Sequence, residues 1–123
     1  MQPKSNKKIM IVDDEEGIRE SLKLILSDHY DLIVTETVAQ CFECLKNARD
    51  IGLVLLDIKM PKMNGLDVLK EIKGKYPHIN VVMITGYRSV ETAGEASSRG
   101  ATGYIVKPFK SDEILTTVGR NLG

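Results

Sequence analysis

The stretch IMIVDDEEGIRESLKLIL, residues 9–26, decides the fold because its hydrophobic pattern changes partway along. Its first four residues are continuously apolar, which is typical of a strand buried on both faces of a parallel sheet. After an acidic turn, apolar residues recur at Ile18, Leu22 and Ile25, the spacing of one face of an α-helix. The stretch therefore predicts a strand, a short acidic turn and a helix.

The same alternation continues along the chain. Four further runs rich in apolar residues stand at 30–34 (YDLIV), 53–56 (LVLL), 81–85 (VVMIT) and 104–106 (YIV). Helical stripes lie between and after them, formed by Val38, Phe42 and Leu45, by Leu66, Leu69 and Ile72, and by Ile114, Leu115, Val118 and Leu122. Strands that alternate with helices are joined by right-handed crossovers. The sequence therefore predicts an α/β fold, a doubly wound sheet of five parallel strands with five helices on its two faces.

The fourth expected helix, residues 89–99, has a weaker apolar face than the others. It offers only Val90, Ala93 and Ala96, and it contains Gly94. Glycine costs about 1 kcal/mol relative to alanine inside a helix. We therefore expect this helix to be the least well anchored of the five.

Length and composition place the chain among globular domains. Its 123 residues, 42% hydrophobic and 28% charged, predict one domain over 1–123 with a core over about 7–122. The 17 basic and 17 acidic residues cancel, which argues against direct binding to nucleic acid. No apolar run approaches the roughly 20 residues of a membrane span, and the polar start does not resemble a signal peptide. We therefore expect a cytoplasmic protein with no membrane partner.

Charged and polar residues stand at the ends of four of the expected strands. They are Asp13 and Asp14 after the first, Asp57 after the third, Thr85 at the end of the fourth and Lys107 after the fifth. In an open α/β sheet, ligands bind outside the carboxyl ends of the strands. If the first and third strands are neighbours, these five side chains converge.

Converging carboxylates need compensation. Two unit charges 4 Å apart repel by about 4 kcal/mol at an effective dielectric near 20, so either a proton or a cation must bind. Lys107 can supply one positive charge, and Mg²⁺ suits a few carboxylates with open positions for phosphate oxygens. Such a site serves phosphoryl transfer, with Asp57 as the nucleophile that forms an aspartyl phosphate and Thr85 as a hydroxyl donor. The alternative is that these residues are ordinary caps and surface groups, with Asp14 capping the first helix.

The motifs occur together, and in order, in a known family. The segments IMIVDDEEGIRESL, VLLDIKMPKMNGLDVL, VVMITGY and GYIVKPF resemble the receiver domain of bacterial two-component response regulators, over nearly the whole chain. The resemblance implies a flavodoxin-like sheet with strand order 2-1-3-4-5, as in the chemotaxis regulators. It also implies a regulatory domain, not an enzyme that turns over substrates, whose Asp57 accepts a phosphoryl group from a sensor histidine kinase or a histidine phosphotransfer protein.

The resemblance assigns ligands to a magnesium ion. It implies that Asp14 and Asp57 bind Mg²⁺ directly and that Asp13 helps through water. The backbone carbonyl of Lys59 completes the protein ligands. The only cofactor expected is therefore Mg²⁺.

The resemblance also implies how phosphorylation is sensed. Lys107 contacts the phosphoryl group, and its peptide bond to Pro108 is cis, a geometry that is rare without proline. Thr85 and Tyr104 match the family's switch pair, so Thr85 moves towards the phosphoryl group and the Tyr104 ring packs inward. The fourth helix then shifts, which changes an output face formed with the fifth strand and fifth helix, and this face can also support a homodimer.

Two further positions tune the lifetime of the phosphoryl group in this family, and Lys59 and Tyr87 occupy them here. A bulky Tyr87 shields an acyl phosphate from water, which predicts slow self-dephosphorylation. The stretch MITGYRSVETAGEA is similar to receivers that precede ATP-driven transcription activators.

Two other functions remain open from the residues. A metal-dependent phosphatase can use an aspartate nucleophile after a strand, but such enzymes carry a D-x-D pattern where this chain has Asp57, Ile58 and Lys59. A receiver-like module that only binds a partner would not need all five polar residues. Phosphorylation by acetyl phosphate with Mg²⁺ distinguishes the three.

Overall fold

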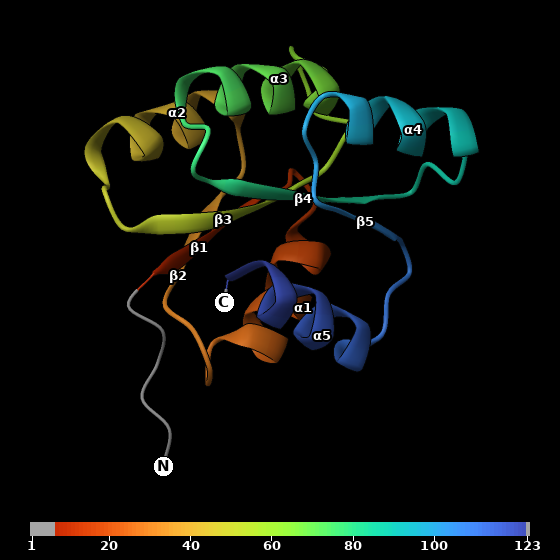
Figure 1. The fold of residues 1–123 in the computed structure, drawn as a ribbon. Helices are drawn as coiled ribbons and strands as arrows, with labels where there is room; N and C mark the ends of the chain where they lie inside the picture. The colour runs from red at the N-terminus through yellow and green to blue at the C-terminus, as the bar shows by residue number, and fades with distance from the viewer. Residues whose placement is uncertain (1–6, 123) are drawn as a thin grey trace.

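Five strands alternate with five helices in the computed structural model, which describes residues 7–122 (Figure 1). The elements are β1 (Lys8–Val12), α1 (Glu16–Leu26), β2 (Leu32–Thr35), α2 (Val38–Asn47), β3 (Ile51–Leu56), α3 (Gly65–Lys75), β4 (Asn80–Thr85), α4 (Val90–Ser98), β5 (Gly103–Val106) and α5 (Ser111–Leu122). The predicted alternation is confirmed. No helix in the described range combines the length and the apolar character that crossing a bilayer requires.

The sheet is parallel throughout, with strand order β2-β1-β3-β4-β5. The predicted order 2-1-3-4-5 is therefore confirmed. In Figure 1, α2, α3 and α4 cover one face of the sheet and α1 and α5 cover the other. The strand order reverses between β1 and β3, and this is the switch point where open sheets of this kind bind ligands.

Successive strand residues enter two different cores. Met10 and Val54 belong to the core under α2, α3 and α4, whereas Ile9 and Leu53 belong to the core under α1 and α5. All four side chains are fully buried. Burying one such side chain contributes about 1.5–3 kcal/mol. The continuous apolar runs follow from this arrangement, since both faces of the central strands are covered.

Helix α4 has the smallest buried face of the helices, as its sequence predicted. Ala96 is its one fully buried residue, whereas α3 buries five. The prediction that Val90 joins this face is wrong, because Val90 is 87% exposed. Val90 is the first residue of the helix, next to the Ser89 side chain that caps it, and the packed part of the helix is centred further along.

The strand register determines which side chains meet at the carboxyl edge of the sheet. Val12 of β1 is paired with Leu56 of β3, so the residues that follow them, Asp13 and Asp57, emerge side by side. Thr85 of β4 is in turn paired with Val106 of β5, the residue before Lys107.

Candidate functional site

The turn after β1 is organised by Asp13. This residue is 2% exposed, and its Oδ1 accepts a hydrogen bond from the Glu15 backbone N–H at 2.9 Å. Asp14 is exposed, and Glu15, at the N-cap position of α1, makes no side-chain cap bond. The prediction that Asp14 caps the first helix is therefore wrong. An Asp side chain bonds most readily to the N–H two residues further on, and Asp13 makes that bond here.

Asp57 lies directly after β3 with backbone packed closely around it. It is 3% exposed, its N–H donates to the Val12 carbonyl at 3.2 Å, and its Oδ1 accepts from the Lys59 N–H at 3.4 Å. The following loop returns against this point, because the Gly65 N–H donates to the Ile58 carbonyl at 2.7 Å. A β-carbon at Gly65 would overlap the Asp57 carbonyl and the Ile58 backbone, so only glycine lets the loop approach this closely.

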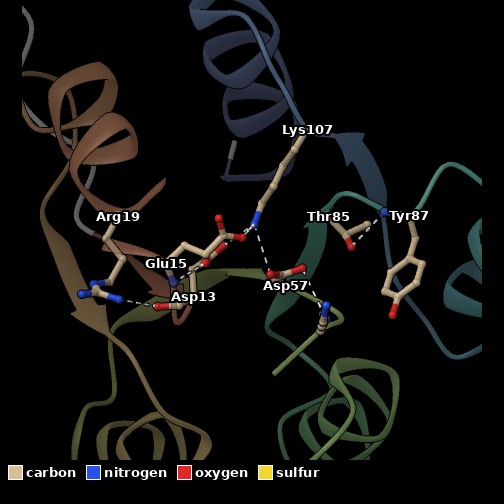
Figure 2. A network of polar contacts seen from close by, with 8 residues as sticks. Asp13, Glu15, Arg19, Asp57, Thr85, Tyr87 and Lys107 are labelled. Atoms are coloured by element: carbon tan, nitrogen blue, oxygen red, sulfur yellow. Dashed lines mark hydrogen bonds and ion pairs between the residues drawn. The ribbon is translucent and has the colours of Figure 1, made fainter. Parts of the chain in front are cut away.

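Lys107 brings the fifth strand into the site. Its backbone N–H donates to the Thr85 carbonyl at 2.8 Å, and its peptide bond to Pro108 is cis. The side chain is 12% exposed and extends over the acidic turn (Figure 2).

The Lys107 ammonium contacts three carboxylates at once. Its Nζ lies 3.0 Å from Asp13 Oδ2, 3.0 Å from Glu15 Oε1 and 3.1 Å from Asp57 Oδ2. Burial alone would lower the pKa of this ammonium, but the three carboxylates outweigh burial and raise the pKa above its ordinary value. For the Asp13 carboxyl, burial has the opposite effect and raises the pKa above its ordinary value. The hydrogen bond from the Glu15 N–H and the charge of Lys107 lower this pKa, but burial outweighs them.

A fourth carboxylate, that of Asp14, joins the three that contact this ammonium. One oxygen from each of Asp13, Asp14, Glu15 and Asp57 lies within 4.8 Å of the others. Lys107 offsets only one of the four negative charges when all are ionised. At such separations a second cation lowers the repulsion by several kcal/mol. The oxygen donors and the excess negative charge fit a hard divalent ion such as Mg²⁺.

Thr85 and Tyr87 form the other side of the site. A cavity of about 240 Å³ opens beside Asp57, and it is lined by Glu15, Asp57, Lys59, Thr85, Gly86, Tyr87 and Lys107. Thr85 is fully buried as a residue, and its Oγ1 accepts a hydrogen bond from the Tyr87 N–H at 3.3 Å. The hydroxyl proton of Thr85 is not used in that bond, so it can be donated to a ligand in the cavity.

Tyr104 is linked to this loop. Its hydroxyl donates to the Tyr87 backbone carbonyl at 2.8 Å. Partial burial, followed by the charge of Asp57, raises the pKa of this phenol. Thr85 and Tyr104 therefore bond to the N–H and to the carbonyl of the same residue, Tyr87.

Sequence reasoning missed two residues of the site, Glu15 and Arg19. Arg19 has a 15% exposed side chain and donates to the Asp13 carbonyl at 2.9 Å (Figure 2). It also pairs with Glu36 at 3.1 Å. The sequence offered only their proximity to the aspartate pair, which does not identify their partners. Glu15 follows the aspartate pair directly, and Arg19 lies one helical turn after Glu15.

Comparison with known proteins now identifies the class. The family described as the response regulator receiver domain matches residues 9–119. The transcriptional regulatory protein FixJ of Azorhizobium caulinodans is 32% identical over 115 residues, which cover 94% of this chain and 54% of FixJ. The regulatory protein AtoC of Escherichia coli is 38% identical over 126 residues, which cover 94% of this chain and 25% of AtoC.

A solved structure gives the same result. The receiver domain of NtrX from Brucella abortus superposes with a TM-score of 0.86 at 38% identity, covering 93% of this chain and 97% of that one. The chain belongs to the response regulator receiver domain family of two-component systems, and it is a regulatory domain. It spans about half the length of FixJ and about a quarter of AtoC.

Proposed function

We propose that Asp57 accepts a phosphoryl group from a phosphohistidine and that the chain works as a phosphorelay switch. The observation that carries this proposal is the Lys107 ammonium, 3.1 Å from Asp57 Oδ2, beside a cavity that both residues line. A carboxylate nucleophile next to a fixed positive charge and an open cavity is suited to phosphoryl transfer.

An Asp57 carboxylate oxygen attacks the phosphorus of the donor's phosphoimidazole. A new O–P bond forms while the N–P bond breaks, and its electron pair stays on the imidazole nitrogen, which can take up a proton. The product is a mixed anhydride on Asp57. Lys107 then holds one phosphoryl oxygen, and the Thr85 hydroxyl donates to another.

The acidic cluster is the proposed magnesium site. Asp14, Asp57 and the carbonyl of Lys59 would hold Mg²⁺ directly, and Asp13 would act through water. Mg²⁺, when bound, supplies positive charge to the phosphoryl oxygens. Asp13 meanwhile stays hydrogen-bonded to Lys107 and orients its ammonium.

The route to the output runs through Tyr87. Phosphorylation adds about −1.5 to −2 charge and three acceptor oxygens, which attract the Thr85 hydroxyl. Movement of Thr85 disturbs its bond from the Tyr87 N–H, and the Tyr87 carbonyl passes that movement to Tyr104. Helix α4 follows most easily, since Ala96 alone is fully buried in it. Phosphorylation thereby reweights two pre-existing conformations.

The proposed partners follow from this switch. A sensor histidine kinase or a histidine phosphotransfer protein supplies the phosphoryl group in the cytoplasm. The face formed by α4, β5 and α5 passes the signal on, and it can do so as a homodimer. Transcription control is the proposed output, because FixJ is named as a transcriptional regulatory protein. Lys59 and Tyr87 both line the cavity and are proposed to set the phosphoryl lifetime.

Incubation with acetyl phosphate and Mg²⁺ tests the proposal. We expect the intact mass to rise by one base-labile phosphoryl group, and the Asp57→Asn variant to remain unlabelled. Asp67→Asn is the matched control, because Asp67 is an exposed aspartate on α3 that does not line the cavity. Continuous turnover without retained label would favour the phosphatase alternative, and neither label nor turnover would favour a module that only binds a partner.

A second measurement tests the switch. Beryllofluoride with Mg²⁺ mimics the phosphoryl group, so we expect amide signals over residues 86–106 to shift. Unchanged signals there, with shifts confined to the neighbours of Asp57, would contradict the proposed route through Tyr87.

A further inference from the structure

All three N–H donors of the Lys107 ammonium have a carboxylate acceptor in this structure. A lysine ammonium carries three N–H donors and no acceptor. Three carboxylates, those of Asp13, Glu15 and Asp57, lie within 3.0–3.1 Å of Nζ. A phosphoryl oxygen can therefore bond to Lys107 only if one of these carboxylates leaves.

Glu15 is the partner that leaves most easily. The side chains of Asp13 and Asp57 are 3% and 4% exposed, and each also accepts a backbone N–H. The Glu15 side chain is 60% exposed, so water can hydrate its carboxylate when the ion pair with Lys107 breaks. Exposed ion pairs contribute only about 0.2–1 kcal/mol. Displacing Glu15 is thus a small cost, whereas displacing either aspartate would strand a buried carboxylate.

The Glu15 carboxylate also repels anions that enter the cavity beside Asp57. Its side chain lines the same cavity as Asp57, Thr85 and Tyr87. Any phosphoryl group or anionic phosphodonor that reaches Asp57 must enter this cavity, and it meets the Glu15 carboxylate there. Like charges repel, and salt screens the repulsion at an exposed site.

We propose that Glu15 is a competitive gate on Lys107: it occupies the phosphoryl position on the ammonium in the resting domain and is displaced when the phosphoryl group arrives. This inference rests on the proposed function of Asp57 and specifies how that site is regulated. Glu15 weakens the binding of phosphoryl groups and of anionic donors. It thereby limits phosphorylation by small donors such as acetyl phosphate, whereas a protein donor gains additional binding energy from its own contacts with the domain.

Two neighbouring glutamates provide a matched experiment. Glu15→Gln removes the charge and Glu15→Ala removes the contact. Glu16→Gln and Glu16→Ala make the same changes one residue along, at an exposed position that does not line the cavity. Binding of beryllofluoride is measured by NMR at saturating Mg²⁺, and Mg²⁺ binding is titrated separately. Labelling by acetyl phosphate is followed for each variant by intact mass.

We expect Glu15→Ala to lower the apparent dissociation constant for beryllofluoride roughly 1.4- to five-fold, the range that an exposed ion pair spans. Labelling by acetyl phosphate should accelerate by a similar factor, and both gains should shrink at high ionic strength. Glu15→Gln should show part of the gain, and the Glu16 variants none. Similar melting temperatures for all variants would show that folding is not the cause.

Two outcomes would overturn the gate. Equal binding in the Glu15 and Glu16 variants would show that Glu15 does not compete. Weaker Mg²⁺ binding in Glu15→Ala, without a gain in beryllofluoride affinity at saturating Mg²⁺, would assign Glu15 to the metal. Failure of the underlying function gives a different result, since the unmodified domain would then take no label at Asp57.

Discussion

Replacing Gly65 with alanine tests how closely the loop after Asp57 must pack. A β-carbon at this position would lie 2.6 Å from the Ile58 Cα and 2.8 Å from the Asp57 carbonyl carbon, closer than β-carbons approach in folded proteins. The obstructing atoms belong to the backbone and cannot rotate away as a side chain could. Overpacking of this kind typically costs 1–3 kcal/mol. We expect a loss near the upper end, about 3 kcal/mol in the free energy of unfolding.

The same substitution at Gly74 provides the control. Gly74 lies in the same helix, α3, and apart from its chain neighbours and its own helix backbone no described atom lies within 4 Å of its added β-carbon. Alanine favours a helix over glycine by up to about 1 kcal/mol. Because Gly74 is near the end of the helix, we expect a gain of about 0.5 kcal/mol.

Urea unfolding followed by circular dichroism measures both variants, with equal slopes confirming that the same surface is exposed. The expected result is a pair of changes of opposite sign in one helix. A Gly65→Ala variant as stable as the unmodified domain would refute the packing. So would destabilisation of both variants by the same amount, since that would reflect the helix and not the contact with Asp57.

Three further substitutions test the surroundings of the site. Asp13→Asn should raise the free energy of unfolding at pH 7 without Mg²⁺, because the raised pKa means that ionisation weakens the folded state. Urea titrations should show this gain disappearing as the pH falls below 3.8, where Asp13 is protonated in the folded and in the unfolded state. No gain at pH 7 would show that ionised Asp13 does not destabilise the fold. Arg19→Met should lower the free energy of unfolding by about 1–3 kcal/mol, because it removes charge-assisted bonds from a partly buried guanidinium. Glu36→Gln should lower it by less than about 1 kcal/mol. Equal losses would mean that the bond to the Asp13 carbonyl contributes little. Tyr87→Ala should speed the loss of phosphoryl label, measured by intact mass over time, while Tyr87→Phe keeps the original rate, and equal rates would remove Tyr87 as a shield.

The fold was predictable because its strands are buried on both faces. Runs such as IMIV and LVLL leave no polar face, and this restricts them to the interior of a parallel sheet. The approach of Asp13, Asp57 and Lys107 was predictable for a related reason. Each residue follows the last residue of a strand, and in a parallel sheet those positions share one edge.

The rest of the site depends on side-chain reach and loop shape, which periodicity does not encode. Glu15 meets Lys107 from a position 92 residues away, through a rotamer of an exposed side chain. Arg19 belongs to an amphipathic helix, and nothing in its spacing distinguishes the Asp13 carbonyl from solvent as its partner. Val90 fits the apolar stripe of α4 in sequence, yet it lies at the first position of the helix, away from the packed part.

The carboxyl edge of the sheet carries more negative charge than Lys107 can offset. The proposed reaction therefore requires a divalent cation in addition to the Lys107 ammonium. Three carboxylates contact the Lys107 ammonium and a fourth, that of Asp14, lies beside them, so Lys107 offsets only part of the negative charge of the resting cluster. A phosphoryl group adds more negative charge and also takes a hydrogen bond from Lys107. Neither change is favourable unless a divalent cation arrives as well. Binding of the phosphoryl analogue should therefore depend steeply on Mg²⁺, and monovalent salt should not replace it, because screening reduces repulsion without supplying a coordinated charge.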